Sequence, residues 1–546
     1  MLGSPERLWL QASALQRAGR AAEAAAVYRQ FIALRPEVVE ARVNLANLLA
    51  IMGASADAEA TYREALAQRR DLPEARFGLA NVLRALGRLE EAVDAYRAGL
   101  ALDANNPGAV YNLGSALQAL GRSDQAFTAF SRAVALKPDF AQAHNNLGIL
   151  HYERAQWEPA LSCFATVLRL HPGFLKARNN LGMALHKLGR MAEAETAFRE
   201  AIRLKPDYIE SFDNLGALLL EMGRTEEAFA CFMRRAALLT ELQPPAESRK
   251  HHDLEQATFR GRATTTVEIE GGARVPGPAI NLRNMIEQTS IAWRTNHPQI
   301  VVIDELLTPE ALEGLRRFCH GSTIWRDTFD GYVGARPQSG FACPLLAQIA
   351  GELARAYPAI FQEHPLLFAW AFKYQQGMSG TRVHADFAAV NVNFWITPDD
   401  ANLDQETGGL VVWDKAAPLD WDFERYNADE AAIRDFLARS GALPTRIPYR
   451  ANRAVVFDSD LFHETDTLAF GPGYTNRRIN VTLLYGTRDA SGKIAGHNPL
   501  WNRCSARSQG DNCCDRERIV SAGKDATARH RHANSVHICG LAALQR

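Results

Sequence analysis

The sequence predicts a multidomain protein of mixed α plus β class, in which an N-terminal α-solenoid of helix pairs is followed by a β-rich domain. The chain has 546 residues, more than one hydrophobic core usually organises. Residues of the same type recur every 34 positions through the first half. The second half instead carries apolar runs that alternate with polar residues, as strands do.

Composition sets the limits within which a function is sought. The 61 basic and 62 acidic residues nearly cancel, which gives no reason to expect a nucleic acid or a membrane as partner. The N-terminus lacks the apolar core of a signal peptide, and no apolar run elsewhere has membrane-spanning length. The eight cysteines form no evident disulfide framework. We therefore expect a cytoplasmic protein.

The repeats share one plan of two helices. A leucine recurs in the first helix, always followed by alanine or glycine, and an aromatic residue recurs in the second helix. The leucines are Leu45, Leu79, Leu113, Leu147, Leu181 and Leu215, and the aromatic residues are Tyr62, Tyr96, Phe130, Phe164, Phe198 and Phe232. This pattern resembles the tetratricopeptide repeat, in about seven units. The resemblance implies a superhelical domain over residues 1–242 whose groove binds a peptide or another protein.

A column of asparagines runs through the first helices of these repeats. Its members are Asn44, Asn112, Asn146, Asn180 and Asn214. Asparagine costs roughly a few tenths of a kcal/mol relative to alanine inside a helix, so some compensation is expected. A carboxamide both donates and accepts, and the column resembles the asparagine ladder that holds extended peptides in the O-linked N-acetylglucosamine transferase superhelix. The alternative is that these asparagines only tie neighbouring helices together.

A boundary follows the repeats. Residues 243–296 abandon the helical period for prolines, glycines and polar residues, which predicts a linker with one strand at most. A new domain starts at residue 297, where an apolar strand is followed by Thr308 and Pro309 as N-cap and first residue of an amphipathic helix. We place this domain at 297–500 and expect residues 501–546 to be a disordered tail.

The stretch GTRVHADFAAVNVNFW, residues 380–395, carries the first sign of chemistry. Read as a strand, it places His384 and Asp386 on one face. A later strand ends with His463. Two histidines and one carboxylate form the facial triad of non-haem Fe(II) oxygenases. The alternative is a strand-end histidine beside an aspartate that only caps the backbone.

Residues around this motif add specificity. Tyr374 stands ten positions before His384, and paired glycines, Gly408 and Gly409, precede a core strand. With the triad, these features resemble the 2-oxoglutarate and Fe(II)-dependent dioxygenases of the prolyl-hydroxylase-like branch over about residues 297–500. The resemblance implies a double-stranded β-helix, a jelly roll of the cupin-like kind. It also implies Fe(II) held by the triad, with 2-oxoglutarate and O₂ as cosubstrates and hydroxylation as the usual outcome.

The same resemblance assigns the residues around the cosubstrate. The hydroxyl of Tyr374 is expected to reach it, and a basic residue in RRINVTLLYG would bind its far carboxylate. Strand alternation favours Arg478, which shares a polar face with Asn480, although Arg477 is the alternative. Asn480 stands where many relatives carry serine, which leaves the second hydrogen bond of the pocket open.

Two asparagines and two segments complete the candidate features. Asn391 and Asn393 are candidates for contact with cosubstrate or substrate, although buried asparagines more commonly only satisfy nearby backbone groups. The inserted segment 414–444 reads as a loop and an amphipathic helix, and is either a lid or structural decoration. Cysteines and histidines in 501–546 suggest zinc, but no paired cysteine motif supports it.

The leading hypothesis joins the two halves. The repeats would recruit a polypeptide, and the dioxygenase domain would hydroxylate one of its side chains. One alternative is an oxygenase acting on a small molecule or glycan, with the repeats docking a partner protein. Another is a non-catalytic repeat scaffold whose oxygenase domain is a relic.

Overall fold

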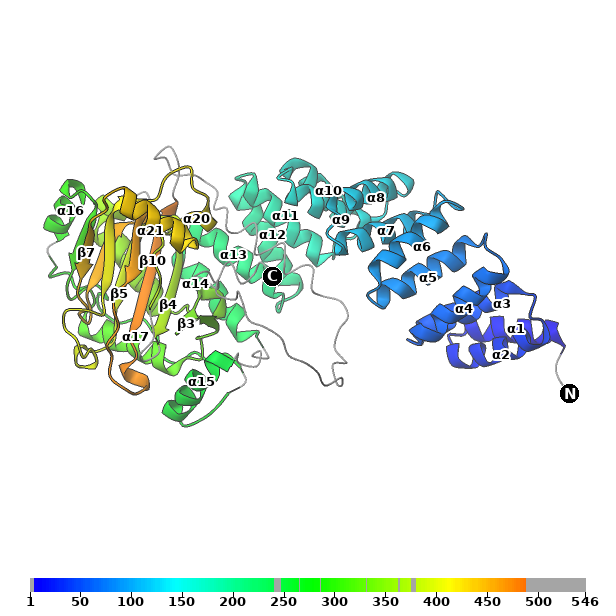
Figure 1. Ribbon diagram of the computed structural model, residues 1–546, viewed down its shortest axis with the longest axis horizontal. Coiled ribbons are helices and arrows are strands. Elements are labelled where there is room, and N and C mark those ends of the chain that lie inside the picture. The colour runs from blue at the N-terminus through cyan, green and yellow to red at the C-terminus, as the bar shows by residue number, and fades with distance from the viewer. Residues whose placement is uncertain are drawn as a thin grey trace. The chain divides into compact units, whose positions relative to one another are not determined.

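The computed structural model describes residues 4–239, 247–264, 266–284, 286–329, 331–361, 364–374 and 380–487. The chain divides into two compact units between Leu188 and Gly189. Figure 1 labels the elements of both units. None of the helices within these described ranges is both long and apolar enough to span a bilayer.

The first unit consists of helices that pack in consecutive pairs (Figure 1). The helices are α1 (Pro5–Arg17), α2 (Ala21–Leu34), α3 (Val39–Ile51), α4 (Ser55–Gln68), α5 (Pro73–Ala85), α6 (Leu89–Leu100), α7 (Pro107–Ala119), α8 (Ser123–Leu136), α9 (Ala141–Glu153), α10 (Trp157–Leu170) and α11 (Leu175–Lys187). The second helix of each pair also contacts the first helix of the next pair, so the apolar face that one pair exposes is buried by its neighbour. The predicted solenoid of helix pairs is confirmed.

The recurring residues have physical causes. A Cβ added at Gly114 would lie 2.7 Å from the Phe130 ring, and one at Gly148 would lie 2.7 Å from the Phe164 ring. The small residue after each leucine therefore makes room for the aromatic residue of the second helix. Gly53 and Gly121 follow first helices with φ near +77° and +72°, a left-handed conformation that glycine adopts without steric cost.

The second unit begins with α12 (Met191–Leu204), α13 (Ile209–Glu221) and α14 (Thr225–Ala237). Helix α13 contacts β4, and α14 contacts α18 and η1. The Arg235 guanidinium pairs with Asp213 at 2.6 Å and also donates to the Gln338 carbonyl. The last helix pair is thus an integral part of the unit that contains the sheets.

Two antiparallel sheets form the centre of this unit. The larger has the order β1-β8-β5-β10-β4-β3-β2, and the smaller has the order β7-β6-β9. The strands are β1 (Ile300–Ile303), β2 (Asp327–Phe329), β3 (Tyr332–Ala335), β4 (Leu366–Tyr374), β5 (Ala388–Trp395), β6 (Leu410–Ala416), β7 (Pro444–Ile447), β8 (Ala454–Asp458), β9 (Leu461–Thr465) and β10 (Ile479–Thr487). Apolar residues of both sheets, such as Trp395 of β5 and Val412 of β6, form one core cluster.

A further set of helices packs against the larger sheet and against one another. They are α15 (Glu247–Arg260), α16 (Ile286–Thr295), α17 (Pro309–Gly321), α18 (Pro344–Ala356) and α19 (Pro358–Phe361). The connections contain two further α-helices, α20 (Phe423–Asn427) and α21 (Glu430–Arg439), and three short helices, η1 (Pro337–Ser339), η2 (Asp399–Ala401) and η3 (Tyr474–Asn476). The predicted start of α17 is confirmed, since Thr308 Oγ1 accepts from the Ala311 N–H. Tyr485 of β10 donates to the Ala350 carbonyl of α18 at 3.0 Å.

The segment 243–296 is more structured than the linker that its composition predicts. It contains α15 and α16, and the Gln256 amide of α15 donates to the Ser322 carbonyl at 2.9 Å. Prolines and glycines interrupt the helical period between these elements, but long-range contacts hold the segment against the sheet domain.

Candidate metal centre

His384 and Asp386 lie in the loop before β5, not inside a strand as the sequence pattern predicts. Only His384 pairs in a ladder, through two hydrogen bonds with His463 of β9, at 3.0 and 2.8 Å. The next two N–H groups donate elsewhere, from Ala385 to the Tyr426 carbonyl and from Asp386 to the Ser459 carbonyl. The backbone therefore leaves the sheet between the two residues, although their side chains still converge.

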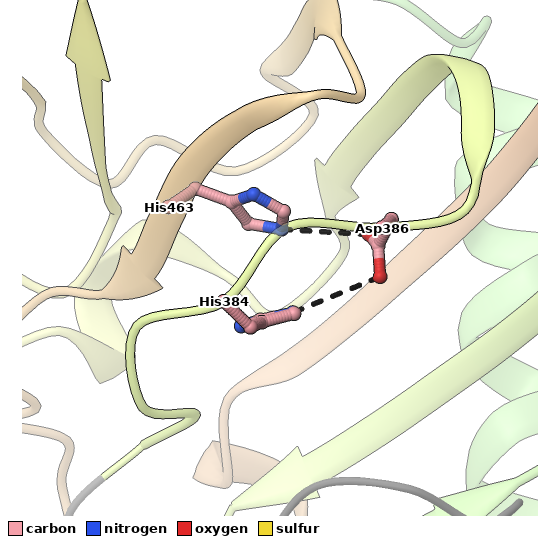
Figure 2. Close-up of side chains that lie close together, drawn as sticks. All are labelled: His384, Asp386 and His463. Atoms are coloured by element: carbon pink, nitrogen blue, oxygen red, sulfur yellow. Dashed lines mark ion pairs between the residues drawn. The ribbon is translucent and has the colours of Figure 1, made fainter. Parts of the chain in front are cut away.

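The three side chains meet at one point (Figure 2). Asp386 Oδ1 lies 3.8 Å from His384 Nε2, and Asp386 Oδ2 lies 3.5 Å from His463 Nε2. One potential ligand atom from each residue lies within 4.8 Å of the other two, and all three residues are buried. Such spacing allows all three to bind a single metal ion.

Hydrogen bonds on the far side of each ring set its tautomer. His384 Nδ1 lies 2.7 Å from the Arg382 carbonyl, and His463 Nδ1 lies 3.0 Å from the Leu461 carbonyl. A carbonyl only accepts, so each neutral ring carries its proton on Nδ1 and directs the Nε2 lone pair toward Asp386. Three acceptors thus face one another, which is unfavourable unless a cation lies among them.

The pKa shifts agree with this arrangement. Burial, reinforced by the neighbouring His463, lowers the pKa of His384 to about 4, so this ring is neutral at physiological pH. Burial opposes ionisation of Asp386, but its polar surroundings, among them the Asn391 amide that donates to it, outweigh burial and hold the pKa of this carboxyl below its usual value. Neutral imidazoles and an ionised carboxylate are the forms that bind metal.

A chain of buried amides extends from Asp386 across the larger sheet. Asn391 donates to Asp386 Oδ2 at 2.6 Å, and Asn393 donates to Asn391 Oδ1 at 2.7 Å. Asn393 Oδ1 in turn accepts from Asn480 at 2.7 Å and from Thr482 at 2.8 Å. These amides bond to one another's side chains and not only to nearby backbone groups, and contact of Asn391 and Asn393 with a cosubstrate or substrate stays a prediction. This series of hydrogen-bonded amides fixes the orientation of the Asp386 carboxylate.

Arg478 lies immediately before β10, on the sheet face that also carries Asn480. Its Nε donates to the Gly408 carbonyl at 2.7 Å, and its Nη2 donates to the Gly409 carbonyl at 3.1 Å. Nη1 is buried without a hydrogen-bond partner among the described residues. Burial lowers the pKa of Arg478 from its ordinary value, a sign that its charge lacks full compensation. An incoming carboxylate would supply it.

Arg477 points to the opposite side of the sheet. Its Nη2 pairs with the Glu255 carboxylate of α15. The two arginines that the sequence left as alternatives therefore lie in different environments, and only Arg478 lies beside Tyr374, with its Cζ 4.8 Å from the ring centroid.

Thr465 joins Tyr374 to the two segments that carry the candidate metal ligands. Its Oγ1 lies 3.3 Å from the Tyr374 hydroxyl, 2.6 Å from Thr381 Oγ1 and 3.1 Å from the Thr381 backbone nitrogen. Sequence reasoning missed this residue. Thr465 follows His463 by two positions, so alternation along β9 was the signal that would have found it.

The asparagine column of the repeats makes contacts between neighbouring repeats. Asn44 donates to the Tyr28 hydroxyl at 3.2 Å, Asn112 donates to Asn81 Oδ1 at 3.0 Å, and Asn146 donates to the Tyr111 hydroxyl at 3.4 Å. These three bonds correspond to the alternative in which the amides tie helices together. Asn180 is 3% exposed in α11, and Asn214 is half-buried in α13. The tail 501–546, with its cysteines and histidines, lies outside the described residues.

Comparison with known proteins identifies the repeats. One tetratricopeptide-repeat model matches residues 80–121 and 119–154, and another matches 10–73 and 149–209. The chain therefore contains tetratricopeptide repeats, as predicted, and repeats of this kind generally mediate protein or peptide binding. No curated protein matches the chain.

Several solved structures are similar to part of the chain. YrrB, described as a TPR protein with an unusual peptide-binding site, is 27% identical with a TM-score of 0.32, over 34% of this chain and 96% of YrrB. MamA from Desulfovibrio magneticus RS-1 is 23% identical with a TM-score of 0.30, over 30% of this chain and 94% of that one. A tetratricopeptide repeat protein from Parabacteroides merdae ATCC 43184 is 17% identical with a TM-score of 0.35, over 43% of this chain and 93% of that one.

Proposed function

We propose that this protein is a 2-oxoglutarate- and Fe(II)-dependent dioxygenase that hydroxylates a side chain of a polypeptide recruited by its tetratricopeptide repeats. One observation carries the proposal above the others. Two imidazoles, each with Nδ1 beside a backbone carbonyl, and a carboxylate converge, while the buried Arg478 guanidinium keeps an N–H group without a partner among the described residues. A divalent cation fits the first group, and a carboxylate-bearing ligand fits the second.

The donor set supports iron over the commoner structural metals. Two histidines and one carboxylate suit non-haem Fe(II), since three protein ligands leave the remaining octahedral positions for other ligands. Zinc in structural sites instead takes four protein ligands, usually with cysteine among them. The two antiparallel sheets would then be the two halves of a double-stranded β-helix, with His463 on β9 of the smaller sheet and with His384 and Asp386 in the loop that leads into β5 of the larger sheet.

Arg478 and Tyr374 would hold the far end of 2-oxoglutarate. The guanidinium is held by the Gly408 and Gly409 carbonyls with one N–H edge unused, so a carboxylate placed there accepts from a donor that is already oriented. The Tyr374 hydroxyl, positioned by Thr465, offers a second donor. Neither group needs to reorganise when the ligand binds, which favours affinity.

Bound Fe(II), 2-oxoglutarate and O₂ supply the oxidation of a substrate C–H bond to C–OH, with succinate and CO₂ as the other products. The protein's own residues contribute positioning. The amide chain from Asn480 to Asn391 holds the Asp386 carboxylate, and the buried setting excludes water from the site.

Anaerobic titration of the purified full-length protein with Fe(II) and 2-oxoglutarate tests the proposal. We expect the wild type to show the weak visible charge-transfer band of Fe(II) bound together with 2-oxoglutarate. We expect His384→Ala to lose this band. Absence of the band in the wild type would contradict the proposal and favour a non-catalytic repeat scaffold. Succinate formed in response to small molecules or glycans, but not to peptides, would instead assign the repeats to docking a partner protein.

A further inference from the structure

We propose that Asn427 is a positioning residue, which acts together with α20 and α21. It holds the loop between the two candidate metal ligands His384 and Asp386. This inference rests on the proposed metal centre. The sequence left open whether the inserted segment 414–444 is a lid or structural decoration. The positioning role proposed here is neither of these.

Ala385, between the two ligands, has no sheet neighbour for its backbone groups. Its N–H donates to the Tyr426 carbonyl at 3.0 Å, and its carbonyl accepts from the Asn427 side-chain amide at 2.8 Å. Both Ala385 and Asn427 are buried. The inserted segment therefore replaces the missing ladder partner, and it does so at the one residue that separates the two ligands.

Side-chain packing follows the same division. Val383 and Ala385 are buried in an apolar cluster with Tyr426, Ile433 and Leu437. The loop residues adjacent to the ligands thus face the inserted segment, while the ligands themselves face one another.

Ion pairs connect α21 to both ligand-bearing segments. Glu430 pairs with Arg382 at 3.3 Å, two residues before His384. Arg434 pairs with Glu464, the residue after His463, at 2.8 Å, and also with Glu430. One short helix therefore contacts the chain beside both histidines, which limits their relative movement.

Metal affinity depends on such support, because ligand atoms must be held within a few tenths of an ångström of their bonding positions. Replacing outer residues that hold metal ligands typically weakens metal binding by about 10- to 100-fold. Loss of the Asn427 amide would leave the buried Ala385 carbonyl without a donor and free the loop to shift.

The experiment compares Asn427→Leu, which removes the amide at similar size, with Asn427→Gln, which keeps an amide on a longer side chain. Gln256→Leu is the matched control, since Gln256 is also a buried amide that donates to a backbone carbonyl, at 2.9 Å to Ser322, on the other face of the larger sheet. Two quantities are measured on the full-length protein. They are the dissociation constant for Fe(II) under anaerobic conditions, and the hydrogen exchange rate of the Ala385 amide without metal.

We expect Asn427→Leu to weaken Fe(II) binding by about tenfold or more and to accelerate exchange at Ala385. Asn427→Gln should recover part of the Fe(II) affinity and part of the slow exchange at Ala385. Gln256→Leu should change neither quantity, even if it lowers the melting temperature as much as Asn427→Leu does. Unchanged Fe(II) affinity in Asn427→Leu, with wild-type affinity intact, would overturn the positioning role alone. Failure of the wild type to bind Fe(II) would instead contradict the proposed function, and the positioning role with it.

Discussion

Arg478 is 1% exposed and forms no ion pair with a carboxylate of the described residues, an unusual state for an arginine. A conservative change tests whether its free N–H edge binds a ligand. Arg478→Lys keeps the charge but loses the planar fork that binds a carboxylate through two hydrogen bonds. We expect the affinity for 2-oxoglutarate, measured calorimetrically with Fe(II) under anaerobic conditions, to fall by roughly tenfold or more.

The neighbouring arginine supplies the control for this experiment. Arg477 is also buried, but it pairs with Glu255 on the opposite face of the sheet. Arg477→Lys should therefore leave the affinity for 2-oxoglutarate unchanged. An equal loss in both variants would show that the effect comes from general destabilisation of β10.

Gly409 provides a second prediction. A Cβ at this position would lie 1.9 Å from the Ile447 carbonyl oxygen and 2.9 Å from Pro448 C, which are backbone atoms that cannot rotate away. We expect Gly409→Ala to separate β6 from β7 and to lower the free energy of unfolding by about 2 kcal/mol or more. Gly471→Ala, whose Cβ would meet nothing closer than 3.6 Å, should stay within about 0.5 kcal/mol of the wild type in the same urea titration.

Strand alternation predicts correctly which way some single residues face, but it fails around Ala385 for a physical reason. It assigns Arg478 and Arg477 to opposite faces, because adjacent side chains alternate along a strand while those two positions apart, such as Arg478 and Asn480, share a face. It misplaces the backbone around Ala385, because the partners of that residue come from Tyr426 and Asn427 in an insertion. Contacts between residues so distant along the chain leave no periodic trace in the sequence.

At the scale of elements, α15 covers a group of buried bases on the larger sheet. Lys373 of β4 is 0% exposed, and its Nζ lies 3.3 Å from His320 Nδ1 of α17 and 3.2 Å from the ring centroid of Tyr474. Burial, followed by the charge of Arg477, lowers the pKa of Lys373 well below its ordinary value. Burial likewise lowers the pKa of His320 to about 3 and that of His252, on α15, to about 4.

This cluster predicts how stability depends on pH. An unfolded histidine binds a proton near pH 6.5, whereas buried His320 resists protonation until about pH 3. Between these values the unfolded chain binds more protons, so stability falls as the pH falls, by up to about 1.4 kcal/mol per pH unit for each such histidine. His320→Asn keeps an acceptor for Lys373 without titrating, and should make the pH dependence shallower.

Urea unfolding at pH 7, 6 and 5 measures this slope. The control is His144→Asn, since His144 is a half-buried histidine of the first unit, outside this cluster, whose ring lies 2.9 Å from the Pro138 carbonyl. The control should keep the slope of the wild type. An unchanged slope in His320→Asn would contradict the assignment of a buried, neutral imidazole at this position.

The docking of α15 also marks the limit of sequence reasoning about elements. The period of 34 residues and the helical faces predict α1 to α14 because the repeats pack mainly within themselves and against adjacent repeats. Between Arg260 and Ile286 the chain instead forms long-range contacts, such as the Glu268 N–H donating to Thr323 Oγ1. Prolines and glycines dominate that stretch, so a local reading predicts a linker while the packing is set from elsewhere.

At the scale of the whole molecule, the proposed separation of recruitment by the repeats from oxidation in the second unit predicts how the two would be coupled. The proposed oxidation needs only residues of the second unit, whereas recruitment of a polypeptide would use the repeats. A change confined to the repeats should then alter turnover only when a peptide substrate is present. Basal 2-oxoglutarate turnover and the Fe(II)-dependent band should remain those of the wild type.

Asn146 and Asn180 are the residues on which to test this separation. The Asn146 amide donates to the Tyr111 hydroxyl at 3.4 Å and accepts from the Asn145 amide at 3.3 Å, both at the long end of hydrogen-bond distances, so its loss costs little stability. We expect the double variant Asn146→Ala and Asn180→Ala to lose most of the peptide-stimulated succinate formation, with the melting temperature changed by only a few degrees. Asn106→Ala, which removes the N-cap of α7 at a cost of about 1 kcal/mol, is the control and should keep peptide stimulation. Equal stimulation in the double variant and the wild type would assign these asparagines to helix packing alone.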